Sequence, residues 1–156
     1  MIVHAAGAVA AGKVGQVRAV GARLLEVPGS FEDAFAASLD LAERGGYTVV
    51  NSTNPHRLEG QKTAAFELID ALGGPPDVLA LPYGGGGNTS AYALGFREAG
   101  GPLPRLYPVE SARRADTVAS AIRITAPVHR AEVDSAVAEF WGEVLSVGDG
   151  ELFYGL

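Results

Sequence analysis

A run of four glycines followed by three hydrogen-bonding side chains is the densest candidate for binding chemistry in this chain. The run extends from Gly84 to Gly87, and Asn88, Thr89 and Ser90 follow it. Glycines let the backbone turn tightly and point successive N–H groups inward, and a following helix adds unpaired N–H groups and the positive end of its dipole. The lysine of a Walker loop and the spacing of a dinucleotide fingerprint are missing. The predicted phosphate cradle consists of Gly84, Gly85, Gly86, Gly87 and Asn88. The alternative is a structural strand-to-helix turn capped by Asn88 or Ser90.

A second concentration of hydrogen-bonding groups lies in the polar segment 51–63. Asn51 and Ser52 offer neutral donors, and Arg57 offers a planar guanidinium that suits phosphate or carboxylate. The segment follows an expected strand end, which is where ligands of open parallel sheets bind. One turn of chain between Asn51 and Arg57 would bring both side chains to the same anion. The same residues also fit a simple helix entrance with Pro55 in its turn.

Short apolar segments alternate with amphipathic ones, and this pattern predicts the elements that position both candidate sites. Strands are expected at 2–5, 23–27, 47–50, 78–82, 106–109 and 143–147. Helices are expected at 10–20, 30–44, 59–72, 88–99, 117–124 and 131–141, with a last one after residue 150. Such alternation is typical of an α/β fold with a mainly parallel sheet and helices on both faces. A polar, proline-containing loop beginning at Asn51 marks the expected subdomain boundary.

Composition and charge exclude several classes of function. The chain has 156 residues, a formal net charge of −6, no basic run and no cysteine, which argues against nucleic-acid binding, disulfides and thiolate chemistry. No apolar stretch is long enough for a membrane span and no signal peptide is recognisable, so a cytoplasmic protein without membrane contact is expected. His4, His56 and His129 lack the paired spacing of metal ligands, so no metal site is predicted.

The segment from Asn51 to Gly73 closely resembles the threonine synthase family, and so does the segment 76–82 that leads into the glycine run. Weaker similarity covers nearly the whole chain. The motif at 51–63 is specific within the larger family of pyridoxal-phosphate lyases and synthases, whereas the glycine loop is shared more broadly. The resemblance implies part of the tryptophan-synthase-beta-like pyridoxal-phosphate fold. Residues 1–50 would then belong to the small subdomain and residues 51–156 to the large, cofactor-binding subdomain.

The same resemblance implies a cofactor, a substrate and the residues that bind them. Pyridoxal phosphate is the expected cofactor, and the expected reaction converts O-phosphohomoserine and water to threonine and phosphate. The residues expected to hold the cofactor phosphate are Gly84, Gly85, Gly86, Gly87 and Asn88. The residues expected to bind the phosphate of a small, O-phosphohomoserine-like anionic substrate are Asn51, Ser52 and Arg57.

Three departures from the family pattern qualify these expectations. Gly85 stands where the family usually has asparagine, so it lacks an amide that the family can use on the substrate phosphate. The stretch between Val109 and Asp116 is shorter than usual. The cofactor-bearing Schiff-base lysine of the family would precede Met1, and the residue that meets the cofactor's ring nitrogen would follow Leu156.

The missing lysine decides what is expected of the chain alone. Lys13 and Lys62 are its only lysines, and both are expected to be solvated or structural, so no catalytic residue is predicted and the isolated chain is expected to be inactive. One alternative is a non-catalytic remnant that binds phosphate-bearing ligands or a partner chain. Another is part of a related pyridoxal-phosphate amino-acid lyase, which Gly85 leaves open. Because an incomplete sheet exposes apolar edges, a homo-oligomer or a complementary chain is expected.

Overall fold

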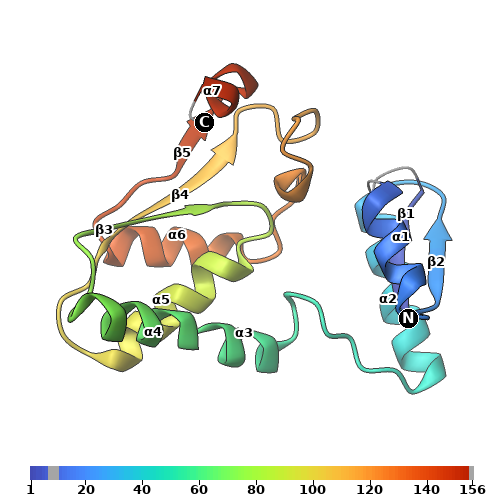
Figure 1. Cartoon of the computed structure of the whole chain (residues 1–156), viewed down its shortest axis with the longest axis horizontal. Helices are drawn as coiled ribbons and strands as arrows, with labels where there is room; N and C mark the ends of the chain where they lie inside the picture. The colour runs from blue at the N-terminus through green and yellow to red at the C-terminus, as the bar shows by residue number, and fades with distance from the viewer. Residues whose placement is uncertain (7–10, 155–156) are drawn as a thin grey trace. The chain divides into compact units, whose positions relative to one another are not determined.

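The computed structural model describes residues 1–6 and 11–154, which fall into two compact units, Met1–Val49 and Val50–Leu156. Each unit combines parallel strands with helices (Figure 1). The predicted α/β class and the parallel strand arrangement are therefore confirmed. The assignment of residues 1–50 and 51–156 to a small and a large subdomain stays a prediction. None of the helices in the described ranges is both long and apolar enough to cross a membrane.

The first unit is built on two parallel strands. Its elements are β1 (Ile2–Ala5), α1 (Ala11–Ala19), β2 (Leu24–Val27) and α2 (Phe31–Gly45). β1 pairs with β2, and α2 contacts both strands. Helix α2 begins at a capping box in which Ser30 and Asp33 bond each other's backbone N–H, as the sequence predicts, and it ends at Gly46 with a left-handed φ of 65°. The backbone hydrogen bond from Ser30 lowers the pKa of the Asp33 carboxyl.

The second unit contains the remaining elements around a three-stranded parallel sheet. These are α3 (Pro55–Gln61), α4 (Thr63–Leu72), β3 (Val78–Pro82), α5 (Gly87–Ala99), β4 (Arg105–Ser111), the 3-10 helix η1 (Ser120–Ile122), α6 (Arg130–Glu139), β5 (Leu145–Val147) and α7 (Asp149–Tyr154). The strand order is β3-β4-β5. α5 connects β3 to β4 and α6 connects β4 to β5, and both helices lie on the same face of the sheet (Figure 1).

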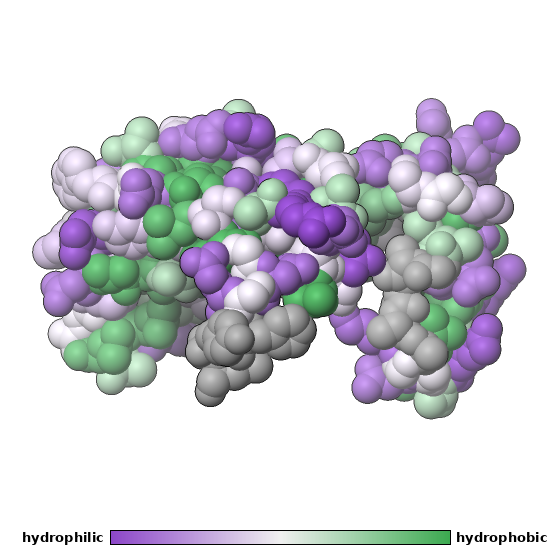
Figure 2. All heavy atoms as spheres, turned by 90° about the horizontal axis from the view of Figure 1, so that it is seen from above, coloured by the Kyte–Doolittle hydropathy of each residue, from purple (hydrophilic) through white to green (hydrophobic). Residues whose placement is uncertain are grey.

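The hydrophobic core of the second unit lies between this sheet and helices α4, α5 and α6. Its buried residues are Ala65, Leu81, Ala93, Phe96, Leu106, Ala136 and Phe140. By strand alternation the opposite face of the sheet carries Val78, Val109 and Leu145, of which Val78 and Leu145 are exposed. Hydrophobic side chains gather over the second unit in the view of Figure 2. The core that supports the glycine run thus lies on only one side of the strands.

Among the described residues, one expected strand is absent and one expected helix is much shorter. Residues 47–50 form no strand: the ring of Tyr47 lies against Gly45, and Val50 is 75% exposed, so no neighbouring strand accepts this apolar run. The helix expected at 117–124 is reduced to η1. There the Thr117 hydroxyl bonds Asp149 Oδ1 at 2.5 Å and accepts the N–H of Ala119 at 3.2 Å, so side chains satisfy groups that a helix would pair.

The helix expected at 59–72 begins earlier and is divided. Asn54 caps α3 by accepting the His56 N–H at 2.9 Å, and Pro55 occupies the first helical turn. Residues 55–57 are therefore helical rather than part of a polar loop. α4 starts at Thr63 after a change of helix at Lys62. Arg57 consequently lies on a helix.

Candidate functional site

The glycine run forms the turn between β3 and α5. Helix α5 begins at Gly87, and Gly86 before it has a φ of 90°, a left-handed conformation that favours glycine. Gly84, Gly86 and Gly87 are buried, while Gly85 and Asn88 are partly exposed. The turn is therefore packed into the unit on one side and accessible at Gly85 and Asn88.

The carbonyl groups of this turn have hydrogen-bond partners in the described part of the unit, whereas its N–H groups do not. Each of its first three carbonyl oxygens accepts a hydrogen bond: Gly84 from Arg114 Nη1 at 3.1 Å, Gly85 from His129 N at 3.0 Å, and Gly86 from the backbone N and Oγ of Ser90, each at 3.0 Å. The backbone N–H groups from Gly84 to Thr89 donate to no described residue. This row of free donors at a helix start, here called the nest, is an arrangement that can bind an anion.

Three of the four glycines are closely packed against neighbouring residues, and one is not. A Cβ on Gly84 would lie 3.1 Å from Ile122 Cα, one on Gly86 would lie 2.9 Å from Val133 Cγ2, and one on Gly87 would lie 2.9 Å from Ser52 Cβ. A Cβ on Gly85 would meet Ile124 Cδ1 at 3.6 Å, an ordinary contact, and Gly85 lacks a left-handed φ. The backbone shape of the nest therefore depends on the other three glycines.

The polar segment supplies a second set of donors beside this nest. Asn51 Oδ1 accepts the Thr53 N–H at 2.9 Å, so the side-chain carbonyl of Asn51 is used within the turn and its NH₂ group is the part that offers donors. Ser52 lies against Gly87 at the start of α5. Gln61 Nε2 donates to Asn88 Oδ1 at 2.8 Å, so α3 and the glycine turn are in direct contact. The structure thus brings Ser52 and Asn88 into one region.

Arg57 is placed differently from the other predicted residues. It lies in the first part of α3 and its side chain is exposed. It takes no part in the ion pairs found among residues 1–6 and 11–154. Its guanidinium is therefore available to an anion from solvent, although among the described residues no hydrogen bond or ion pair joins it to Ser52 or the glycine turn.

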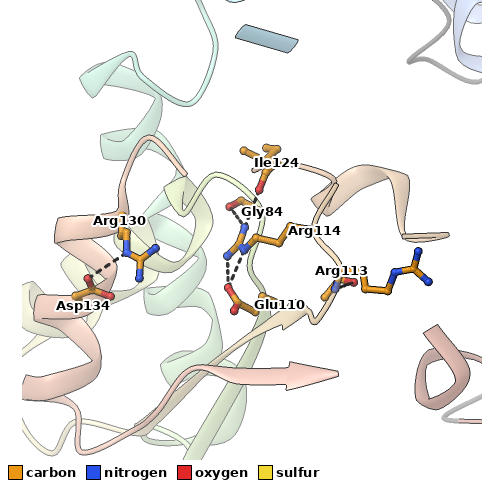
Figure 3. A network of polar contacts seen from close by, with 8 residues as sticks. Gly84, Glu110, Arg113, Arg114, Ile124, Arg130 and Asp134 are labelled. Atoms are coloured by element: carbon orange, nitrogen blue, oxygen red, sulfur yellow. Dashed lines mark hydrogen bonds and ion pairs between the residues drawn. The ribbon is translucent and has the colours of Figure 1, made fainter. Parts of the chain in front are cut away.

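Arg114 also supports the glycine turn, and no pattern in the sequence predicted this role. Its Nη1 donates to the carbonyls of Gly84 and Ile124, while its Nε donates to Glu110 Oε2 at 2.8 Å (Figure 3). The guanidinium carbon also lies 4.5 Å from the centroid of the Tyr83 ring. Burial raises the pKa of Tyr83, which favours the neutral phenol. Arg114 thereby fixes the strand end from which the turn departs.

Lys62 is held in a structural ion-pair cluster. Its Nζ lies 2.5 Å from Glu59 Oε2 and 2.7 Å from Glu98 Oε2, and its side chain is only 15% exposed. The hydrogen bonds to Glu59 and Glu98 raise the pKa of the Lys62 ammonium. The charged form is therefore favoured, whereas attack on a carbonyl requires the neutral amine. Lys13, on α1, is exposed.

We expect Lys13 to react before Lys62 when the chain is labelled with pyridoxal phosphate and borohydride at pH 8. Because the pKa of the Lys62 ammonium is raised, a smaller fraction of this lysine is neutral at pH 8. Its two carboxylate partners also restrict the access of pyridoxal phosphate to the amine. Peptide mass spectrometry after limited labelling measures both sites. Glu98→Gln removes one charged partner and should increase labelling of Lys62 while leaving Lys13 unchanged. Stoichiometric labelling of Lys62 in the unaltered chain would contradict the structural role.

Comparison with known proteins identifies the family of the chain. The family described as "Pyridoxal-phosphate dependent enzyme" matches residues 1–155. The chain is 39% identical to a threonine synthase of Bacillus sp. over 99% of this chain and 48% of that protein. It is 41% identical to a threonine synthase of Synechocystis sp. over 94% of this chain and 42% of that protein. The chain thus spans about half the length of the curated relatives it matches.

Solved structures show the same fold. The structure of maize serine racemase superposes with a TM-score of 0.77 at 21% identity, covering 96% of this chain and 49% of that one. A fungal L-serine ammonia-lyase from Rhizomucor miehei gives a TM-score of 0.73 at 21% identity, covering 90% of this chain and 50% of that one. At such low identity the likeness concerns the fold alone.

Proposed function

This chain belongs to the pyridoxal-phosphate-dependent enzyme family, and from that premise we propose that it is the part of a threonine synthase that holds the cofactor phosphate and the substrate phosphate. The proposed reaction converts O-phosphohomoserine and water to threonine and phosphate. The observation that carries the proposal is the row of unpaired N–H groups from Gly84 to Thr89 directly beside Ser52. The identity with threonine synthases over nearly the whole chain supports the choice of reaction.

The glycine turn fits the phosphate of pyridoxal phosphate. Its N–H groups are free, its carbonyls are turned away, and α5 adds the positive end of its dipole. The residues that would hold this phosphate are Gly84, Gly85, Gly86, Gly87 and Asn88. When bound, pyridoxal phosphate supplies the conjugated ring that takes up electrons from the reacting amino acid. In this proposal the glycine turn binds the phosphate of the cofactor.

The substrate phosphate is assigned to the neighbouring donors. The NH₂ group of Asn51 and the hydroxyl of Ser52 offer neutral hydrogen bonds, and Arg57 offers a charged, two-pronged donor. Two phosphates in adjacent sites repel each other, so the positive charge of Arg57 offsets part of that repulsion. In this proposal Arg57 binds the anion, and Asn51 and Ser52 orient it.

Arg57→Ala is expected to weaken binding of O-phosphohomoserine about tenfold to a hundredfold, because a charged hydrogen bond contributes roughly 1.5–3 kcal/mol. Affinity for pyridoxal phosphate should stay near that of the unaltered chain, since no hydrogen bond or ion pair joins Arg57 to the glycine turn in the described part of the chain. Isothermal titration of the 156-residue chain with each ligand measures both values.

Arg105→Ala is the matched control for that titration. Arg105 is also exposed, but it begins β4 and so lies at the opposite end of the sheet from the glycine turn. Equal O-phosphohomoserine affinities for Arg57→Ala and Arg105→Ala would remove Arg57 from the site. Circular dichroism confirms that each variant is folded.

A second candidate function is favoured by Gly85. This position has room for a side chain, yet glycine lacks the side-chain amide that could contact a substrate phosphate. A pyridoxal-phosphate lyase acting on an unphosphorylated amino acid would need no such group. Titration with homoserine beside O-phosphohomoserine separates the two functions, because only a threonine synthase site requires a strong preference for the phosphorylated ligand.

A further inference from the structure

His129 links the two proposed phosphate sites through separate groups. It precedes α6 and is 7% exposed. Its backbone N–H donates to the carbonyl of Gly85 at 3.0 Å, and its ring Nε2 lies 2.6 Å from the carbonyl of Ser52. A carbonyl oxygen only accepts, so Nε2 carries the hydrogen of this bond. A single residue therefore ties the turn that contains Ser52 to the glycine turn.

The surroundings of the ring hold this bond in place. A Cβ built on Gly86 would lie 3.0 Å from the Cβ of His129, and one built on Gly87 would lie 3.6 Å from its Cδ2. The imidazole therefore lies along the backbone of the two glycines. Its Nδ1 is 3.6 Å from Glu132 Oε1, beyond a normal hydrogen bond. The strong polar contact of the ring is thus the one to Ser52.

We propose that His129 is a positioning residue that holds the turn at 51–54 in register with the glycine turn, so that the two anion sites are arranged before ligands bind. This role rests on the proposed function, because it concerns the relative placement of the two phosphates. The ring bond to Ser52 fixes the substrate side. The backbone bond to Gly85 fixes the cofactor side and does not depend on the side chain.

Replacing the ring of His129 should therefore affect the substrate site but not the cofactor site. His129→Gln keeps an N–H donor at nearly the reach of Nε2, whereas His129→Asn has a shorter side chain and loses contact with Ser52. His129→Asn should weaken O-phosphohomoserine binding roughly tenfold, as expected for loss of one buried hydrogen bond. His129→Gln should retain affinity within about twofold, and both variants should bind pyridoxal phosphate as the unaltered chain does, because the backbone bond remains.

Amide hydrogen exchange provides a readout that is independent of the substrate. The N–H groups of Thr53 and Asn54 are bonded to Asn51 within the 51–54 turn, so they should exchange faster in His129→Asn than in His129→Gln. Amides of β4 should exchange equally in both variants, which shows that the core is intact.

The outcomes are distinguishable from failure of the proposed function. If the unaltered chain binds no O-phosphohomoserine but exchange at Thr53 and Asn54 responds as expected, the proposed substrate is wrong while the positioning by His129 stands. If both variants behave alike in exchange and titration, the ring serves only to fill space and the proposal is overturned. Equal loss of pyridoxal phosphate binding and O-phosphohomoserine binding would also overturn it.

Discussion

Gly86→Ala should weaken binding of pyridoxal phosphate by an order of magnitude or more, while Gly85→Ala should leave it nearly unchanged. Gly86 has a φ of 90°, where an L side chain is strained, and its new Cβ would lie 2.9 Å from Val133 and 3.0 Å from His129 Cβ. Relief of this strain, worth about 1–3 kcal/mol, requires a backbone shift, and the N–H groups of the nest would then no longer converge. Gly85 has neither the strained φ nor a close neighbour.

Titration with pyridoxal phosphate and with inorganic phosphate measures this difference, and the pair of variants serves as its own control. Both substitutions add one methyl group within the same turn, so composition and helix propensity are matched. Normal phosphate binding by Gly86→Ala would show that the nest is not the anion site. Equal loss in both variants would show that the turn responds to any added side chain, whatever its backbone geometry.

Local signals predicted the position of this turn well. The apolar run 78–82 predicted a strand before the glycines, and the segment 88–99 predicted a helix after them. The structure has β3 and α5 at these places. The same logic found the Ser30 cap of α2. Turn and cap chemistry depends on residues close in sequence, which is why such elements can be read from the chain.

Contacts between distant segments could not be predicted in this way. His129 and Arg114 reach the glycine turn only because α6 and the segment after β4 are folded against it. A lone histidine and a surface-like arginine carry no spacing signal. The apolar run at 47–50 failed as a strand for the related reason that a strand needs a partner, and the described structure places none beside it. Tertiary context decides in both cases.

The close approach of α5 to the α3–α4 junction is what joins the two halves of the candidate site. A Cβ on Gly95 would lie 2.4 Å from the backbone oxygen of Lys62 and 2.7 Å from Ala65 Cβ. Only glycine allows this distance. The same approach places Gln61 within hydrogen-bonding distance of Asn88. Packing at Gly95 and the geometry of the site are therefore coupled.

Gly95→Ala should accordingly lower the free energy of unfolding of the second unit by about 3 kcal/mol, the upper range for overpacking a core. The obstacle is a backbone oxygen, which cannot rotate away like a side chain, so α5 must move off the junction. Gly60→Ala is the control: Gly60 is also helical but has nothing within 4 Å of its Cβ position, and alanine there should stabilise by roughly 0.5–1 kcal/mol. Urea unfolding followed by circular dichroism measures both changes. Equal stability of the two variants would mean that α5 does not pack at this distance, and the contact between Gln61 and Asn88 would lose its structural basis.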